Sequence, residues 1–167
     1  PCDCKYQNGD GIDIDIDRAM FLPDNCTVTR VVVKLMTSEY EVIGEVHEAI
    51  SHASEGSNIS PVYNFKIECR KDVFNTTLTA LIRIDTMDST TLNTVAVGYA
   101  AIKVFSTIDR EQPTTPKQPN TFLNTGLFQL PIHGGRLKKS GNMSEKSLAH
   151  LPRLPCSSLL VRIYAAP

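Results

Sequence analysis

The sequence predicts an all-β protein, an eight-stranded antiparallel β-sandwich with long loops. Apolar residues alternate with polar residues along several short segments, which is the period of a strand with one buried face. No segment shows the three- to four-residue apolar spacing of a convincing amphipathic helix. The strand-like segments follow one another without a linker, so we expect a single domain over residues 1–167, with its core within about 11–165.

The predicted strands follow in chain order. The first is GIDIDIDRAMF, residues 11–21, in which isoleucines alternate strictly with aspartates. The second, TVTRVVVKLM, is rich in β-branched residues, whereas the third, YEVIGEVH, alternates only weakly around Gly44. The strands after the first are predicted at residues 27–36, 40–47, 61–70, 78–85, 94–105, 126–132 and 157–165.

The aspartates of the first strand match part of a calcium-binding EF-hand loop. Asp13, Asp15 and Asp17 fall at loop positions 1, 3 and 5, and Asp24 falls at position 12. An EF-hand requires Gly at position 6 and a bidentate Glu at position 12, but Arg18 and Asp24 stand there. On a strand, the three acids form a row about 6.5 to 7 Å apart, too widely spaced to wrap one ion. We therefore expect this row to be a solvent-exposed acidic face.

Charge and composition exclude several function classes. The 167 residues are 41% hydrophobic and 21% charged, with a net charge of −1. A near-neutral chain lacks the general attraction to phosphate on which nucleic-acid binding depends, so no nucleic acid is expected as a partner. No apolar run approaches the roughly 20 residues of a membrane-spanning helix. The chain opens without Met, and we expect it to be one segment of a longer protein.

Cysteines and glycosylation motifs point to different compartments. An odd number of scattered cysteines favours reduced intracellular thiols over a disulfide framework. The five cysteines are Cys2, Cys4, Cys26, Cys69 and Cys156. Four Asn-x-Ser/Thr motifs keep open the alternative of a secreted glycoprotein domain. They begin at Asn25, Asn58, Asn75 and Asn142.

Two long segments interrupt the predicted strands. Residues 106–125 contain three prolines, each of which removes a backbone donor. Residues 133–155 are glycine-rich and then basic. Loops of this length in a compact domain are usually functional or disordered. We expect them to contact a partner; the alternative is that they are insertions without a function.

Three segments resemble C2 domains, which are eight-stranded sandwiches. NISPVYNFKIE is similar to a strand of the family that begins with an extended Asn-x-Pro segment and continues with alternating aromatic residues. LTALIRIDTMDSTTLNTVAVGYAAIKV resembles the family's strand–loop–strand unit, which ends in Gly-Tyr-Ala. GLFQLPI resembles its penultimate strand. The three occur in the expected order, and the resemblance implies a C2-like sandwich.

Two segments extend the resemblance to the C2-like part of ciliary coiled-coil proteins. They are DIDRAMFLPDNCTVTRV near the start and LPRLPCSSLLVRI near the end. This resemblance implies a cytoplasmic protein of the cilium or flagellar axoneme, with coiled coils before this domain. Its partners would then be axonemal or other cytoskeletal proteins.

Calcium-dependent C2 domains hold their ions with acids from two loops, and those positions are degenerate here. In DTMDSTTLNT, Asp85 matches the first ligand, Met87 stands in the second place, and Asp88 is displaced by one residue. Asn93 stands near the last ligand position, and Asp24 is the single acid of the other loop. Calcium takes six to eight oxygens, so we expect no physiological calcium site and no other cofactor.

A C2-like domain can also contact a membrane, and this remains the alternative to protein docking. Phe21, Leu22 and Met87 are the candidates for insertion into lipid. A basic face would add attraction to anionic lipid. Its candidates are Lys66, Arg70, Lys71, Arg136, Lys138 and Lys139. These charges are dispersed among acids, so ordinary solvated charge is the favoured interpretation.

No catalytic residue is predicted. The sequence contains no nucleophile elbow, phosphate-binding loop or dinucleotide-binding motif. His47 and His52 lie five residues apart, which is the wrong spacing for two ligands on one helical face. We therefore expect a non-enzymatic, calcium-independent docking module.

Overall fold

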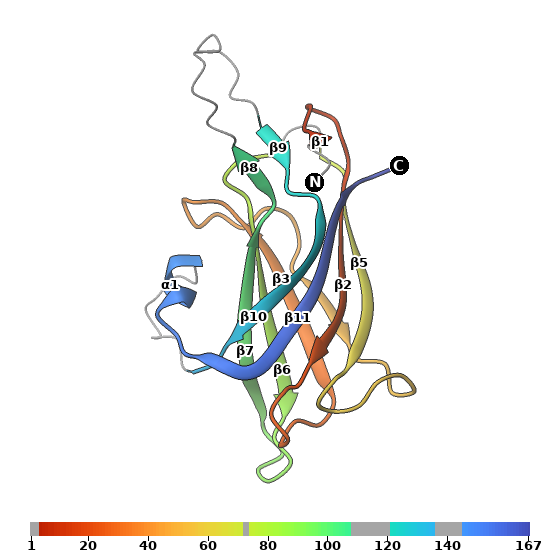
Figure 1. Cartoon of the computed structure of the whole chain (residues 1–167), viewed down its shortest axis with the longest axis vertical. Helices are drawn as coiled ribbons and strands as arrows, with labels where there is room; N and C mark the ends of the chain where they lie inside the picture. Colours follow the sequence, from red (N-terminus) through yellow and green to blue (C-terminus); the bar gives the residue numbers. More distant parts are fainter. Residues whose placement is uncertain (1–3, 72–73, 108–120, 136–144) are drawn as a thin grey trace.

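The eight main strands form one continuous antiparallel sheet that folds over into two facing layers of four strands, here called the first and the second sheet (Figure 1). The computed structural model describes residues 4–71, 74–107, 121–135 and 145–167. The first sheet contains β4 (His47–Ile50), β3 (Thr29–Met36), β6 (Thr79–Met87) and β7 (Thr94–Lys103). The second contains β10 (Gly126–His133), β11 (Arg153–Ala165), β2 (Ile12–Met20) and β5 (Val62–Cys69). One residue pair, Tyr99 with His133, joins β7 to β10 where the strands pass from one layer to the other.

The core lies between the two sheets. Ile12, Ile14 and Ile16 of β2 are fully buried, as the alternation predicted. Across the core, β3 and β6 contribute buried side chains with the same two-residue period, among them Val31, Val33, Ile82 and Ile84. These aliphatic side chains form one continuous cluster. The apolar alternation therefore determines which face of each strand is inside.

Smaller elements surround the sandwich. A three-stranded sheet of β1 (Cys4–Lys5), β9 (Thr121–Leu123) and β8 (Phe105–Thr107) lies at the end where the N-terminal segment is found (Figure 1). Tyr6 makes edge contacts with the rings of Phe74 and Phe105, the second of which belongs to β8. One five-residue helix, α1 (Glu145–Ala149), precedes β11. No helix among the described residues has the length and hydrophobicity needed to cross a bilayer.

Seven of the eight predicted strands are confirmed, and one is wrong. Residues 40–46 form a loop, in which a single bridge joins Val42 to Met36, and the strand begins only at His47. The reason is local: Tyr40 and Gly44 both have positive φ, 64° and 75°, which turns the chain where a strand would continue. Four short elements were not predicted from the sequence: β1, β8, β9 and α1. The predicted contact loop 106–125 lies largely outside the described residues, at 108–120, and the loop 133–155 lies partly outside them, at 136–144.

Candidate functional site

Three loops come together at one end of the sandwich, and we call them the loop rim. They are residues 21–28 between β2 and β3, residues 51–61 between β4 and β5, and residues 88–93 between β6 and β7 (Figure 1). Hydrogen bonds join neighbouring loops. The Leu22 N–H donates to the Ile59 carbonyl at 2.7 Å, and the Thr27 hydroxyl donates to the Met87 carbonyl at 2.6 Å. The rim is thus one connected surface.

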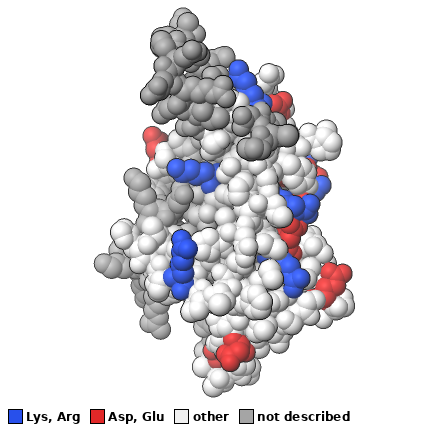
Figure 2. Space-filling model, viewed as in Figure 1, with Lys and Arg blue, Asp and Glu red and all other residues white. Residues whose placement is uncertain are grey.

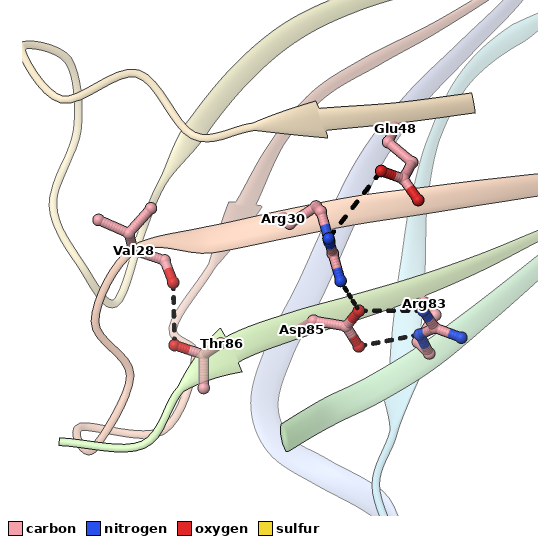
Figure 3. Close-up of polar contacts among 6 residues, drawn as sticks. All are labelled: Val28, Arg30, Glu48, Arg83, Asp85 and Thr86. Atoms are coloured by element: carbon pink, nitrogen blue, oxygen red, sulfur yellow. Dashed lines mark hydrogen bonds and ion pairs between the residues drawn. The ribbon is translucent and has the colours of Figure 1, made fainter. Parts of the chain in front are cut away.

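Asp85, the first predicted calcium ligand, lies at the base of the rim and is already bonded (Figure 3). Its Oδ1 accepts from Arg83 Nε at 2.9 Å. Its Oδ2 accepts from Arg83 Nη2 and from Arg30 Nη2, each at 3.1 Å. Arg30 also lies 3.9 Å from a carboxylate oxygen of Glu48. With only 5% of Asp85 exposed, this carboxylate serves as the acceptor between two guanidinium groups.

Asp88 and Asn93 shape the loop between β6 and β7. The Asp88 Oδ1 accepts the N–H groups of Thr90 and Thr91 at 2.8 and 2.9 Å. These backbone hydrogen bonds favour the ionised carboxylate and lower the pKa of Asp88. The Asn93 carbonyl in turn accepts the Asp88 N–H at 2.9 Å. Asp88 therefore closes a turn, which is the usual local role of an Asp side chain.

The four calcium candidates lie at one end of the fold but do not form one ligand cluster. Asp24 is exposed on the loop between β2 and β3, Asp85 is bound by arginines, and Asp88 binds backbone amides. No group of three or more His, Cys, Asp or Glu side chains within the described ranges could hold a metal ion. Chemically, the rim offers isolated acids rather than a set of converging oxygens.

The three residues predicted to insert into lipid differ in their exposure. Phe21 and Met87 are about half exposed, at 55% and 49%, and project from the rim. The prediction for Leu22 is wrong because it is only 4% exposed and belongs to the core. Phe21 has a φ of 56°, so the chain reverses there and the next side chain turns inward.

Five more exposed apolar residues in or next to the rim loops were missed. They are Val28, Ile50, Ile59, Leu92 and Val95. Leu92 stands alone in the polar stretch DSTTLN, which is a signal that sequence reasoning could have used. Ile50 belongs to β4, whose position was predicted wrongly, so its exposure was not accessible from the sequence.

Two of the candidates for a basic face, Lys66 and Arg70, are paired with an acid. Arg70 Nη2 lies 2.8 Å from Asp13 Oδ1, and Lys66 Nζ lies 3.8 Å from Asp13 Oδ2. Asp13 therefore offsets the charges of Lys66 and Arg70, as expected for basic residues dispersed among acids. Lys71 is exposed just after β5. Arg136, Lys138 and Lys139 lie outside the described residues.

The expectation of a solvent-exposed acidic row on β2 is also wrong. Asp13 is 1% exposed and Asp15 is 6% exposed, although both point away from the core. Figure 2 shows basic and acidic side chains close together along the right side of the molecule. Arg162 from β11 bridges Asp17 and Asp15, with both bonds to Asp17 at 2.8 Å and an ion pair to Asp15 at 3.0 Å. The Tyr164 hydroxyl donates to Asp15 at 2.9 Å. Long side chains from both neighbouring strands thus cover the acids.

Comparison with solved structures supports the architecture. PLC21 from S. officinalis has a TM-score of 0.55 and 15% identity, over 93% of this chain and 15% of that one. The chain has a C2-like fold. CC2D1B gives a TM-score of 0.48 at 10% identity, over 94% of this chain and 55% of that one. A C2 domain protein from Ramazzottius varieornatus gives 0.40 at 14% identity, over 97% and 94% of the two chains.

Sequence comparisons add no closer relationship. No protein-family model matches the chain, and no curated protein matches it. The chain spans 15% of PLC21 and about half of CC2D1B. At these identities the likeness concerns the fold alone.

Proposed function

We propose that the chain is a non-enzymatic C2-like docking module that binds a protein partner without calcium. The observation that carries the proposal is the double arginine contact of Asp85. A calcium ion at this position would have to displace two guanidinium groups from a nearly buried carboxylate. The remaining acids of the rim do not converge with it on a common point. Recognition by this end therefore depends on contacts other than a bridging metal ion.

A protein partner accounts for the surface charges better than an anionic membrane does. Lys66 and Arg70, which could attract acidic lipid, are paired with Asp13. The three rim loops carry acids but no Lys or Arg. Attraction to anionic lipid depends on basic residues near the surface, each contributing on the order of 1 kcal/mol. Membrane contact by the apolar rim residues is the alternative that the experiments below separate.

The ciliary setting rests on the sequence resemblance. DIDRAMFLPDNCTVTRV and LPRLPCSSLLVRI resemble the C2-like part of ciliary coiled-coil proteins. We propose a cytoplasmic location in the cilium or axoneme and an axonemal or other cytoskeletal partner.

Calcium titration tests the metal-free mechanism. We expect no binding heat when the purified chain is titrated to about 1 mM calcium, which is the weak end of protein calcium sites. Magnesium serves as the matched control for non-specific ion effects. Stoichiometric calcium binding at micromolar concentration would contradict the calcium-independent mechanism.

Cosedimentation tests the partner class. We expect the chain to pellet with detergent-extracted axonemes in EGTA and equally in calcium. Vesicles of phosphatidylcholine with phosphatidylserine are the parallel sample. Pelleting with these vesicles but not with axonemes would favour peripheral membrane binding and overturn the docking proposal.

A further inference from the structure

Exposed apolar side chains are concentrated at the loop rim. Eleven large hydrophobic residues are exposed among those the structure describes, and seven of them lie at this end. Of the other four, Tyr40, Val42 and Val46 share one loop, and Leu127 lies on β10. The seven at the rim end are Phe21, Val28, Ile50, Ile59, Met87, Leu92 and Val95. Isolated exposed apolar residues are ordinary, whereas a group at one end of a domain indicates an interaction surface.

Two of these residues are presented on strained backbone. Phe21 has a φ of 56° and Leu92 has a φ of 58°, in the left-handed region that bulky residues avoid. Hydrogen bonds hold both: Phe21 donates its N–H to Ser60 Oγ at 3.2 Å, and Leu92 donates its N–H to the Asp88 carbonyl at 2.9 Å. Glycine or asparagine would fit these turns at lower cost. A bulky apolar side chain at such a site, exposed to water, contributes little to the isolated fold, which points to a role in binding.

A hollow in the same end is the right size for one side chain. It has a volume of about 210 Å³, and Val28, Ile50 and Met87 contribute apolar walls. The Val28 carbonyl accepts a hydrogen bond from the Thr86 hydroxyl at 3.1 Å, which fixes one wall (Figure 3). The rest of the lining is polar and consists of Arg30, Asp85 and three threonines, Thr29, Thr86 and Thr94. Small-molecule sites usually measure about 300 Å³ or more, so this hollow suits a single apolar side chain of a partner.

The charge of the rim identifies the chemistry of that partner. The three loops contain Asp24, Glu55 and Asp88, and no Lys or Arg. The neighbouring cations are engaged: Arg30 and Arg83 bind Asp85, and Arg18 donates to the Ser60 carbonyl at 3.0 Å. The lower tip of the molecule accordingly shows acidic and no basic side chains in Figure 2. Complementary charge on a partner is basic.

We propose that the loop rim docks a protein segment that inserts an apolar side chain between Val28, Ile50 and Met87 and places Lys or Arg beside the rim acids. Phe21 and Leu92 are the outer apolar contacts of this surface. The inference deepens the proposed function, on which it rests, by naming the surface and the kind of partner.

A binding assay with designed peptides tests the chemistry. The probe is a labelled amphipathic peptide of Leu and Lys, and the matched control is the same peptide with Glu for Lys. We expect the Leu/Lys peptide to bind and the Leu/Glu peptide to bind at least 10-fold more weakly. The variant Asp24→Asn/Glu55→Gln should reduce this discrimination. Equal binding of the two peptides, or unchanged discrimination in the variant, would overturn the proposal.

Substitutions at the rim test the surface itself. Phe21→Ser/Met87→Ser/Leu92→Ser should weaken binding of the Leu/Lys peptide at least 10-fold. Leu127→Ser is the matched control, because Leu127 is equally exposed but lies on β10, and it should leave binding unchanged. An unchanged Tm of both variants shows that the exposed substitutions leave the fold intact. Binding that survives the triple substitution would overturn the assignment of the rim.

Axoneme cosedimentation separates this inference from the function on which it rests. The wild-type chain and Leu127→Ser should pellet with axonemes in EGTA, and the triple rim variant should remain in solution. If the triple variant still pellets with axonemes, the assignment of the rim is rejected while the docking function stays in place. Failure of the wild-type chain to pellet would reject the docking function itself.

Discussion

The outer face of β2 and the loop rim both carry acidic side chains, and the acids of the two regions have opposite surroundings. On β2, Asp13 lies 2.8 Å from Arg70, and Asp17 accepts two bonds of 2.8 Å from Arg162. At the rim, Asp24 and Glu55 stand on loops without any Lys or Arg. The acids of β2 are covered because antiparallel neighbours place long basic side chains beside them. Neighbours across the sheet thus decide whether an acid is paired within the fold or remains without a cation beside it.

The largest expected effect is on the β2 face. Arg162→Met removes the cation shared by Asp15 and Asp17, leaving Asp15 nearly buried with only the Tyr164 hydroxyl as a donor. Breaking a buried ion pair costs about 3 to 5 kcal/mol. Because the Arg162 side chain is 49% exposed and water can enter, we expect a loss of about 2 kcal/mol in the free energy of unfolding. Urea unfolding followed by circular dichroism measures it.

Removing an acid instead of the shared cation is the control for Arg162→Met. Asp17→Asn leaves Arg162 next to solvent and still paired with Asp15, so it should cost less than about 1 kcal/mol. Equal losses for the two variants would show that the acids of β2 are as solvated as those of the rim. The comparison between the regions would then fail.

Asp85 sharpens the comparison because it lies beside the rim but is covered like the acids of β2. Asp85→Asn removes the charge from the contacts with Arg30 and Arg83. Both arginines are partly exposed and regain water, so we expect a loss of about 1 kcal/mol in the free energy of unfolding. Thermal unfolding checks this value, and a neutral effect would place Asp85 with the open acids of the rim.

The open acids of the rim should contribute least to the fold. Asp24→Asn/Glu55→Gln should change the free energy of unfolding by no more than about 0.5 kcal/mol, as expected for exposed loop positions. The same urea experiment measures it beside Arg162→Met. A loss comparable to that of Arg162→Met would mean that the rim acids are structural, leaving them unavailable to a partner.

The fold was predictable because its main signal is local. Alternation along residues 12–16 placed Ile12, Ile14 and Ile16 in the core, and seven strands followed from similar patterns. The failure at residues 40–47 arose because left-handed backbone at Tyr40 and Gly44 ends the alternation, and alternation alone does not reveal φ.

The site was less predictable because it depends on contacts between distant residues. Asp15 and Arg162 are far apart in sequence, yet β2 and β11 pair these two positions directly. The same holds for Asp85, whose partner Arg30 comes from the paired position on β3. From the sequence alone, an acid on the outer face of a strand appears solvated until its neighbouring strand is known. The exposure of Phe21 and Met87 agrees with the prediction, whereas Leu22 is buried because the chain turns at Phe21.

The smallest expected effect concerns the pKa of Asp88. Backbone N–H groups, and not a cation, stabilise the ionised form of this rim acid. The N–H groups of Thr91 and Thr90 hold the pKa of Asp88 below its ordinary value of 3.8. A depressed pKa in the folded state means that this contribution to stability is present above pH 3.8 and is lost as the pH falls through the folded value. We expect the amide signals of Thr90 and Thr91 in an NMR titration to shift at a lower pH than in a peptide of residues 86–95, where the turn is not held. If chain and peptide titrate together, the backbone contacts do not stabilise the ionised carboxylate. Asp88 would then be an acid as open to a partner as Asp24, and the rim would present more free negative charge than its turn geometry indicates.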